Sequence, residues 1–205
     1  MSGYINFMRN LNLDDLKPDP ILMSDPSMFD RSREIFGETL LNTFDMMSQV
    51  KKEADQVGFE RLKILDICYD LKETRYYVLL ERIYSRLQIV ASKEWILCYE
   101  IDQIRDFCLA NMRRLNCPKF VAWAKKKENI VRANQEAIRL NRLVSQKNVA
   151  AQRFKKKWES VKEDLNFEIA ECLRLAEELR TRYNDDNESK KPCKKSKKSN
   201  RKSKK

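Results

Sequence analysis

The stretch that decides the fold is residues 130–183, IVRANQEAIRLNRLVSQKNVAAQRFKKKWESVKEDLNFEIAECLRLAEELRTRY, where apolar residues recur with a period of seven. With Ile130 as position a, thirteen of the sixteen a and d residues are apolar, over more than seven heptads. Such a repeat predicts a coiled coil. The spacing predicts one helix from Lys119 to Tyr183, about 90 Å long at the usual rise per residue. We therefore expect an elongated, all-α fold of three long helices, with a C-terminal coiled-coil domain at residues 117–184.

The apolar seam of this helix is the predicted interface with another chain, because so long a rod cannot bury itself in a globule. Its predicted interface residues are Ile130, Ala137, Leu140, Val144, Ala151, Phe154, Trp158, Val161, Leu165, Leu175 and Leu179. Lys147 and Glu168 stand at d positions, where a charge is costly unless it is paired across the seam. This pattern favours a different coiled-coil protein as the partner over a second copy of the chain.

Two segments precede the coiled coil. Residues 1–25 are predicted to be irregular because Pro18 and Pro20 interrupt them, and their apolar residues either fold back on the body or anchor a partner. Residues 26–116 are predicted to form a helical hairpin or a bent helical region. Asp25 followed by Pro is a helix start, and Gly58 is the expected break.

The helix expected from Phe59 to Asn116 is apolar on two sides, so we predict that it lies between two other helices. One side carries Leu62, Leu65, Tyr69, Tyr76, Leu79, Ile83, Val90, Leu97, Ile104 and Phe107, and the other carries Ile64, Cys68, Leu71, Val78, Leu80 and Leu87. The pair Cys117-Pro118 is expected to end this helix, because proline disfavours helical geometry in the residue before it.

Positive charge is concentrated at the C-terminal end of the sequence. Residues 189–205 hold ten Lys or Arg and no acid, whereas residues 1–188 hold 32 basic and 31 acidic residues and sum to +1. The predicted polyanion-binding residues are Lys190, Lys191, Lys194, Lys195, Lys197, Lys198, Arg201, Lys202, Lys204 and Lys205. Residues 185–205 are predicted to be a disordered tail that binds nucleic acid, acidic tubulin tails, anionic lipid or an import receptor with little selectivity. The tail is either a localisation signal or a binding arm.

The residues that most enzymes need are scarce. The chain has no His, and its 3 Gly cannot build a phosphate-binding loop. We therefore expect no enzyme, no cofactor, no metal and no small-molecule substrate. The six cysteines form no CxxC pair and are expected to be reduced core residues. Without a recognisable signal peptide or a membrane-spanning run, we expect a cytosolic or nuclear protein.

Two lysine triplets, at residues 125–127 and 155–157, lie next to Trp123, Phe154 and Trp158. We expect these lysines to shield the seam, and the alternative is a calmodulin-type target or a surface that docks an acidic partner.

The segment FKKKWESVKEDLNFEIAECL, residues 154–173, resembles part of the IQ-motif-containing coiled-coil subunits of the nexin–dynein regulatory complex. Trp158, Lys162, Asp164 and Glu168 match the pattern, whereas Val161 departs from it and the IQ motif is absent. The resemblance implies a structural subunit that links doublet microtubules in a cilium or sperm flagellum. A lysine-rich tail suits the acidic surface of tubulin.

These observations together predict a non-enzymatic coiled-coil scaffold or structural subunit of the cytoskeleton, in an axoneme. Two alternatives stay open. A BAR-like module would bind membranes, and a nuclear protein would bind nucleic acid through the tail. The near-neutral body disfavours the BAR-like module, because curvature sensing needs basic charge along the folded surface.

Overall fold

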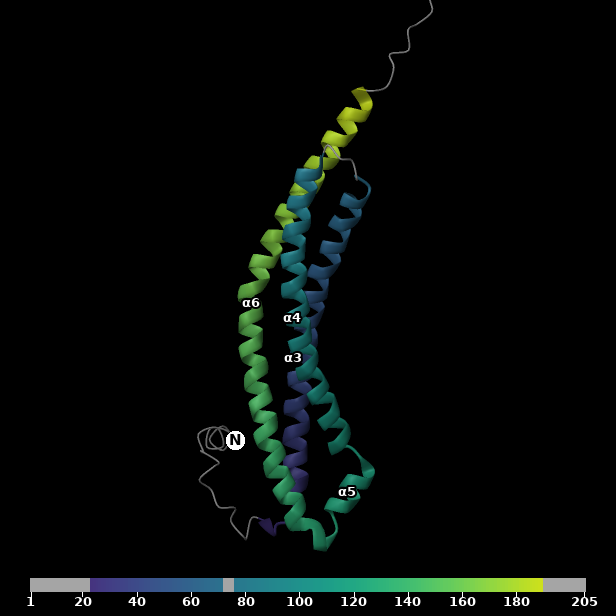
Figure 1. Ribbon diagram of the computed structural model, residues 1–205. Coiled ribbons are helices and arrows are strands. Elements are labelled where there is room, and N and C mark those ends of the chain that lie inside the picture. Colours follow the sequence, from purple (N-terminus) through teal and green to yellow (C-terminus); the bar gives the residue numbers. More distant parts are fainter. Residues whose placement is uncertain (1–22, 72–75, 190–205) are drawn as a thin grey trace, which may run out of the picture. The chain divides into compact units, whose positions relative to one another are not determined.

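The computed structural model describes residues 23–71 and 76–189 (Figure 1). Along the chain lie helix α3 (Met28–Tyr69), helix α4 (Tyr77–Leu115), the short helix α5 (Pro118–Ala124), the 3₁₀ turn η2 (Lys127–Asn129) and helix α6 (Ile130–Ser189). Every regular element in the described ranges is helical, which confirms the all-α class. The three long helices contain 42, 39 and 60 residues.

The predicted break at Gly58 is wrong, because α3 continues to Tyr69 and the chain turns between there and Tyr77. Gly58 has no left-handed backbone conformation. A Cβ built at this position would approach Glu94 Oε1 of α4 to 2.2 Å. Gly58 therefore allows close contact between two helices, and it does not terminate one. Of the two arrangements predicted for residues 26–116, the structure shows the helical hairpin.

The third predicted helix also differs at both ends. The break at Cys117-Pro118 is present, but α5 and η2 follow it, so α6 begins at Ile130 and not at Lys119. Asn129 Nδ2 donates to the carbonyl oxygen of Trp123 at 2.9 Å, and this bond holds the additional turn in place. At the other end α6 reaches Ser189, so residues 185–189 are helical and do not belong to a disordered tail. No Gly or Pro lies between Arg180 and Ser189 to end the helix earlier.

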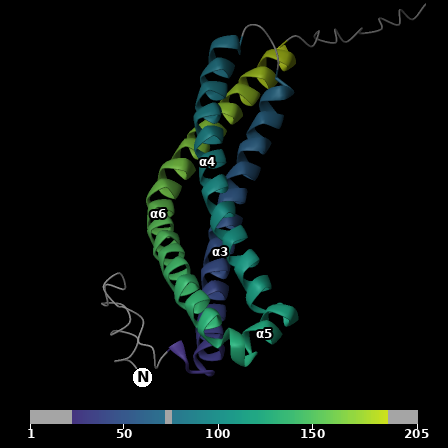
Figure 2. The ribbon, with the colours of Figure 1, turned by 60° about the horizontal axis from the view of Figure 1, so that its bottom comes forward.

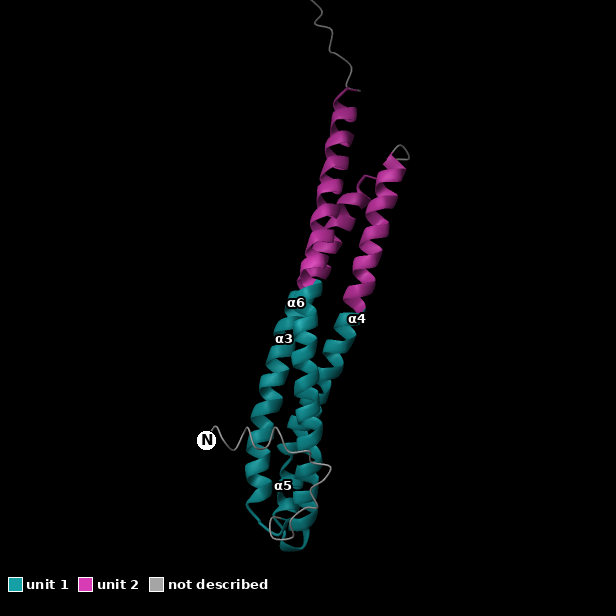
Figure 3. Ribbon diagram, turned by 90° about the vertical axis from the view of Figure 1, so that its left-hand side faces the viewer, with its two compact units in different colours: residues 1–54, 96–161 teal, residues 55–95, 162–205 magenta. Residues whose placement is uncertain are grey.

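Two compact units divide the chain (Figure 3), and each contains part of α3, α4 and α6. Unit 1 takes Met1–Ala54 and Ile96–Val161, and unit 2 takes Asp55–Trp95 and Lys162–Lys205.

The described part of unit 1 is a bundle of three helix segments that lie side by side (Figure 2). Its largest fully buried side chains are Leu40, Met47, Ile101, Leu140 and Trp158.

The start of α3 is held by polar contacts and by aromatic packing. Asp25 Oδ1 accepts from the Ser27 N–H at 2.8 Å, so Asp25 caps the helix as predicted. The buried Asn134 Nδ2 donates to the carbonyl oxygens of Met23 and Asp25 at 2.8 and 3.0 Å. The ring of Phe29 lies 5.6 Å from that of Phe120, which joins α3 to α5.

The described part of unit 2 is a second three-helix core. It buries Ile64 and Cys68 from α3, Ile83, Leu87 and Val90 from α4, and Leu165, Cys172 and Leu179 from α6. Arg61 Nε donates to Glu94 Oε2 at 3.1 Å, which links α3 to α4. Arg86 Nη1 donates to Glu168 Oε2 at 2.9 Å, which links α4 to α6. In this unit α4 contacts both other helices, so the predicted position between two neighbours is confirmed.

Candidate interaction surfaces

The predicted partner seam of α6 lies in the core of the chain itself. Nine of its eleven residues are buried, and Ile130 and Val161 are half-buried. Among the nine, Leu140, Trp158 and Leu165 are 1% exposed. These side chains pack against the chain's own helices, so the prediction that they form an interface with another chain is wrong. The heptad pattern was detected correctly, but α3 and α4 supply the facing helices.

Trp158 shows how completely the seam is occupied. The indole Nε1 donates to Glu53 Oε2 of α3 at 2.8 Å within unit 1. A buried Trp needs a hydrogen-bond partner for this N–H group, and the carboxylate supplies it. The ring is therefore fixed inside the bundle in both its packing and its polarity.

The two charges in the seam also find partners within the chain. Lys147 Nζ lies 5.5 Å from the centre of the Phe107 ring on α4. Glu168 accepts the hydrogen bond from Arg86. Charges at d positions predicted a different protein across the seam, and the bundle satisfies them without one.

We therefore expect the helicity of the isolated chain to be independent of its concentration. A seam filled by the chain's own helices needs no association to stay folded. Circular dichroism over a dilution series of the purified chain measures this directly. A loss of helical signal on dilution would mean that the three-helix bundles depend on a second chain.

The cysteines confirm their expected place in the core. Cys68, Cys108 and Cys172 are buried, and Cys98 and Cys117 are half-buried, all as free thiols. Burial raises the pKa of Cys68 and of Cys108 to about 11, which keeps both thiols protonated and unreactive at neutral pH. Across the described ranges, no group of three potential ligands from His, Cys, Asp and Glu could hold a metal ion. No helix in these ranges is long and apolar enough to cross a membrane.

The ten basic residues predicted to bind polyanions, at positions 190–205, lie outside the described residues. Both lysine triplets are exposed. Lys125 pairs with Asp30 at 3.4 Å, and Lys157 pairs with Glu100 at 3.3 Å. Phe154 and Trp158 are only 6% and 1% exposed, so they cannot serve as the anchors of a calmodulin-type target. The lysines flank a buried seam, as we expected.

The most unusual surface of the molecule is an apolar area on α3 and α4 of unit 2, which we call the aromatic face. Its members are large apolar side chains between 38% and 78% exposed, namely Phe59, Leu62, Tyr69, Tyr77, Val78, Tyr84, Ile89 and Trp95. Soluble monomers rarely expose so many large apolar side chains together, and such patches mark sites of interaction.

The contacts between α3 and α4 place the two rows of this face side by side. Phe59 and Leu62 flank Arg61, and Trp95 follows Glu94, so the Arg61–Glu94 pair sets them at one level of unit 2. Tyr69 follows Cys68 in the same way. Burial first, and then the nearby Cys68 thiol, raises the pKa of Tyr84, which places Tyr84 of α4 beside that part of α3.

The aromatic face was missed in the sequence because Leu62, Tyr69 and Val78 were assigned to buried stripes. Each is more than half exposed, so that assignment is wrong. In a three-helix bundle each helix buries only the arc that faces its two neighbours. The residues on the remaining arc stay in solvent, however apolar they are.

No family model, curated protein or solved structure gives a significant match to the chain. Its function is therefore inferred from its own surfaces.

Proposed function

We propose that the chain is a non-enzymatic helical scaffold that binds a partner protein through the aromatic face of unit 2. The observation that carries this proposal is the exposure of Trp95, Tyr69 and Tyr77, at 71%, 65% and 64%. Trp and Tyr are the residues most enriched at the energetic centres of protein interfaces. Leaving them in water has a cost in solubility, which a bound partner removes.

The surroundings of the face indicate the kind of partner. Lys63 lies 4.6 Å over the ring of Phe59 and pairs with Glu60 at 2.9 Å, so a polar rim borders the apolar rows. A central apolar area with a charged rim is the usual anatomy of a protein interface. Two parallel rows of side chains on neighbouring helices suit the apolar side of an amphipathic helix. We therefore expect a helical protein, such as another coiled-coil chain, as the partner.

A cytoskeletal setting, in a cilium or flagellum, stays a prediction from the resemblance at residues 154–173. Trp158 and Glu168, which carry part of that resemblance, have contacts inside the bundle. Binding to tubulin tails or other polyanions would use the tail, which lies outside the described residues, and so would a nuclear role. A membrane-bound module is the other alternative. These settings differ in the neighbours that the scaffold would have in the cell.

Replacing Ile89 and Trp95 together by Gln should remove the partner at least tenfold, because interface aromatics each contribute strongly to binding. Both residues are exposed, at 57% and 71%, so the bundle should stay folded. The full chain, fused to a proximity-labelling enzyme in its native cell, reports the enrichment of each neighbour. Axonemal, membrane and chromatin neighbours form separate sets, so the same measurement identifies the setting.

The matched control replaces Ile35 and Leu41 by Gln. These residues are 61% and 49% exposed on α3 in unit 1, away from the aromatic face. The control should keep every neighbour of the unchanged chain. If the Ile89 and Trp95 variant loses no neighbour that the control retains, the aromatic face is not a binding surface.

A further inference from the structure

Charge is distributed very unevenly along α6, although the body of the chain is nearly neutral in total. Residues 130–161, in unit 1, hold eight Lys or Arg and two Glu. Residues 162–189, in unit 2, hold four Lys or Arg and nine Asp or Glu. The first half of α6 therefore carries about +6 and the second about −5 at neutral pH. We call these the basic half and the acidic half.

Most of the charges on the basic half face solvent. Six of its basic side chains are exposed beyond the two that contact α4, namely Arg132, Arg139, Arg142, Arg153, Lys155 and Lys156. Glu136, one of its two acids, is shared between Arg114 of α4 at 2.6 Å and Arg139 at 2.8 Å. These two arginines hold the pKa of Glu136 below its usual range. The net positive charge of the basic half is therefore displayed outward.

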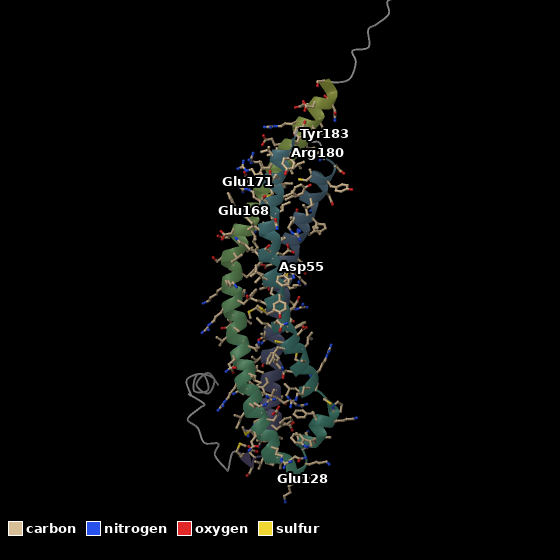
Figure 4. The ribbon with its side chains drawn as sticks, in the orientation of Figure 1. Asp55, Glu128, Glu168, Glu171, Arg180 and Tyr183 are labelled. Atoms are coloured by element: carbon tan, nitrogen blue, oxygen red, sulfur yellow. The ribbon has the colours of Figure 1, made fainter. Side chains whose placement is uncertain are left out.

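The acidic half compensates its few basic residues within the helix. Arg174 pairs with Glu171 at 2.9 Å and with Glu178 at 3.4 Å, and Arg182 pairs with Glu178 at 2.5 Å. Figure 4 labels Glu168 and Glu171 on this half. Glu163, Asp164 and Glu177 are exposed. A surface of uncompensated carboxylates remains.

Exposed apolar residues accompany both halves. Val131 and Val149 on the basic half are 46% and 45% exposed, and Phe167 on the acidic half is 68% exposed. They recur every 18 residues, which is five turns of an α-helix, so they share one side of α6.

We propose that α6 binds α6 of a second copy of the chain in antiparallel orientation, with the basic half of each copy against the acidic half of the other. The register that sets Val149 against Phe167 of the second copy also sets Arg153 against Glu163 and Arg139 against Glu177. All three pairs are centred on residue 158. One register therefore brings an apolar contact and two pairs of opposite charge together, and two-fold symmetry forms each of them twice.

A second copy is the occupant that this surface fits best, because its charge pattern is complementary to itself. A nucleic acid or an anionic membrane would attract the basic half but repel the acidic half of the same helix. A dimer satisfies both halves at once. The contact uses α6 and not the aromatic face, so it adds to the proposed function and is independent of it.

Sedimentation equilibrium of the full chain tests the proposal. We expect a dimer at about 50 mM salt and a clear shift to monomer at about 500 mM, because exposed ion pairs are screened over a shorter distance at high salt. Arg153→Glu and Glu163→Arg should each raise the dissociation constant about tenfold, since each reversal acts twice in a symmetric dimer. The chain that carries both reversals should recover nearly the original constant, because opposite charges face each other again.

Two controls keep the result specific. Lys52→Glu makes the same charge change as a basic-to-acidic reversal at an exposed site on α3, and it should leave the constant unchanged. The variant with Gln at Ile89 and Trp95 should also dimerise normally. A chain that is monomeric at both salt concentrations overturns the proposal. So does a dimer that the charge reversals do not weaken, or one that the loss of Ile89 and Trp95 abolishes.

Discussion

Replacing Trp158 by Ala should lower the free energy of unfolding by about 3–5 kcal/mol, the range for removing a large side chain from a packed core. Trp158 is 1% exposed and is the largest fully buried side chain of the bundle. Its removal leaves a cavity between α3 and α6 and takes the indole donor from Glu53. Urea denaturation followed by circular dichroism gives this free energy.

Two further substitutions separate packing from hydrogen bonding. Trp158→Phe keeps most of the ring and loses only the donor to Glu53, so it should cost about 1–2 kcal/mol. Trp95→Ala removes the same side chain from a site that is 71% exposed, and it should change the free energy by less than about 0.5 kcal/mol. If Trp158→Ala costs no more than Trp95→Ala, Trp158 does not lie in the core.

Raising the pH from about 8 to about 11 should destabilise the chain by roughly 2–3 kcal/mol for each of Cys68 and Cys108, at 1.36 kcal/mol per pKa unit. Burial raises the pKa of both thiols from 9.0 to about 11 in the folded chain. Between these values the unfolded chain has lost a proton that the folded chain retains, so the rising pH favours unfolding. The two thiols together should account for roughly 5 kcal/mol.

The measurement is a series of urea denaturation curves over this pH range. Lysine and tyrosine side chains titrate in the same range, so the unchanged chain is compared with the double variant Cys68→Ala, Cys108→Ala. The double variant starts from a lower stability but should lose less of it as the pH rises. Parallel pH profiles for the two chains would show that these thiols ionise as easily in the folded state as in the unfolded one.

Moving the seam of α6 into the interior changes where a partner can bind. A coiled-coil surface for another chain would have made folding and assembly one event. In the structure the bundles are complete without a partner, and binding falls to surfaces that the helices leave over. The aromatic face of unit 2 and the outer side of α6 are such surfaces, and they are tested by substitutions that leave the core intact.

The sequence determined the helices and the sides of α6 that would be buried. Few Gly and Pro interrupt the chain, and the heptad from Ala137 to Leu179 coincides with the buried side of α6. Asp25 as a cap and Cys117-Pro118 as a break were also predictable, because capping and proline geometry act over a few residues. These features depend on local backbone chemistry and on periodicity, both of which are written along the chain.

Only the tertiary structure decided which helix faces which. A heptad shows that a side will be buried, but a helix of the same chain and a helix of another chain bury it equally well. The choice depends on whether α3 and α4 can reach α6, and that is decided by the turn after Tyr69, which the local pattern placed at Gly58. Glu94 beside Gly58, Glu53 beneath Trp158 and Arg86 against Glu168 are contacts between residues far apart in sequence. The aromatic face exists for the same reason. Three helices can each bury only one arc, and which apolar residues remain outside is settled by the packing of the bundle.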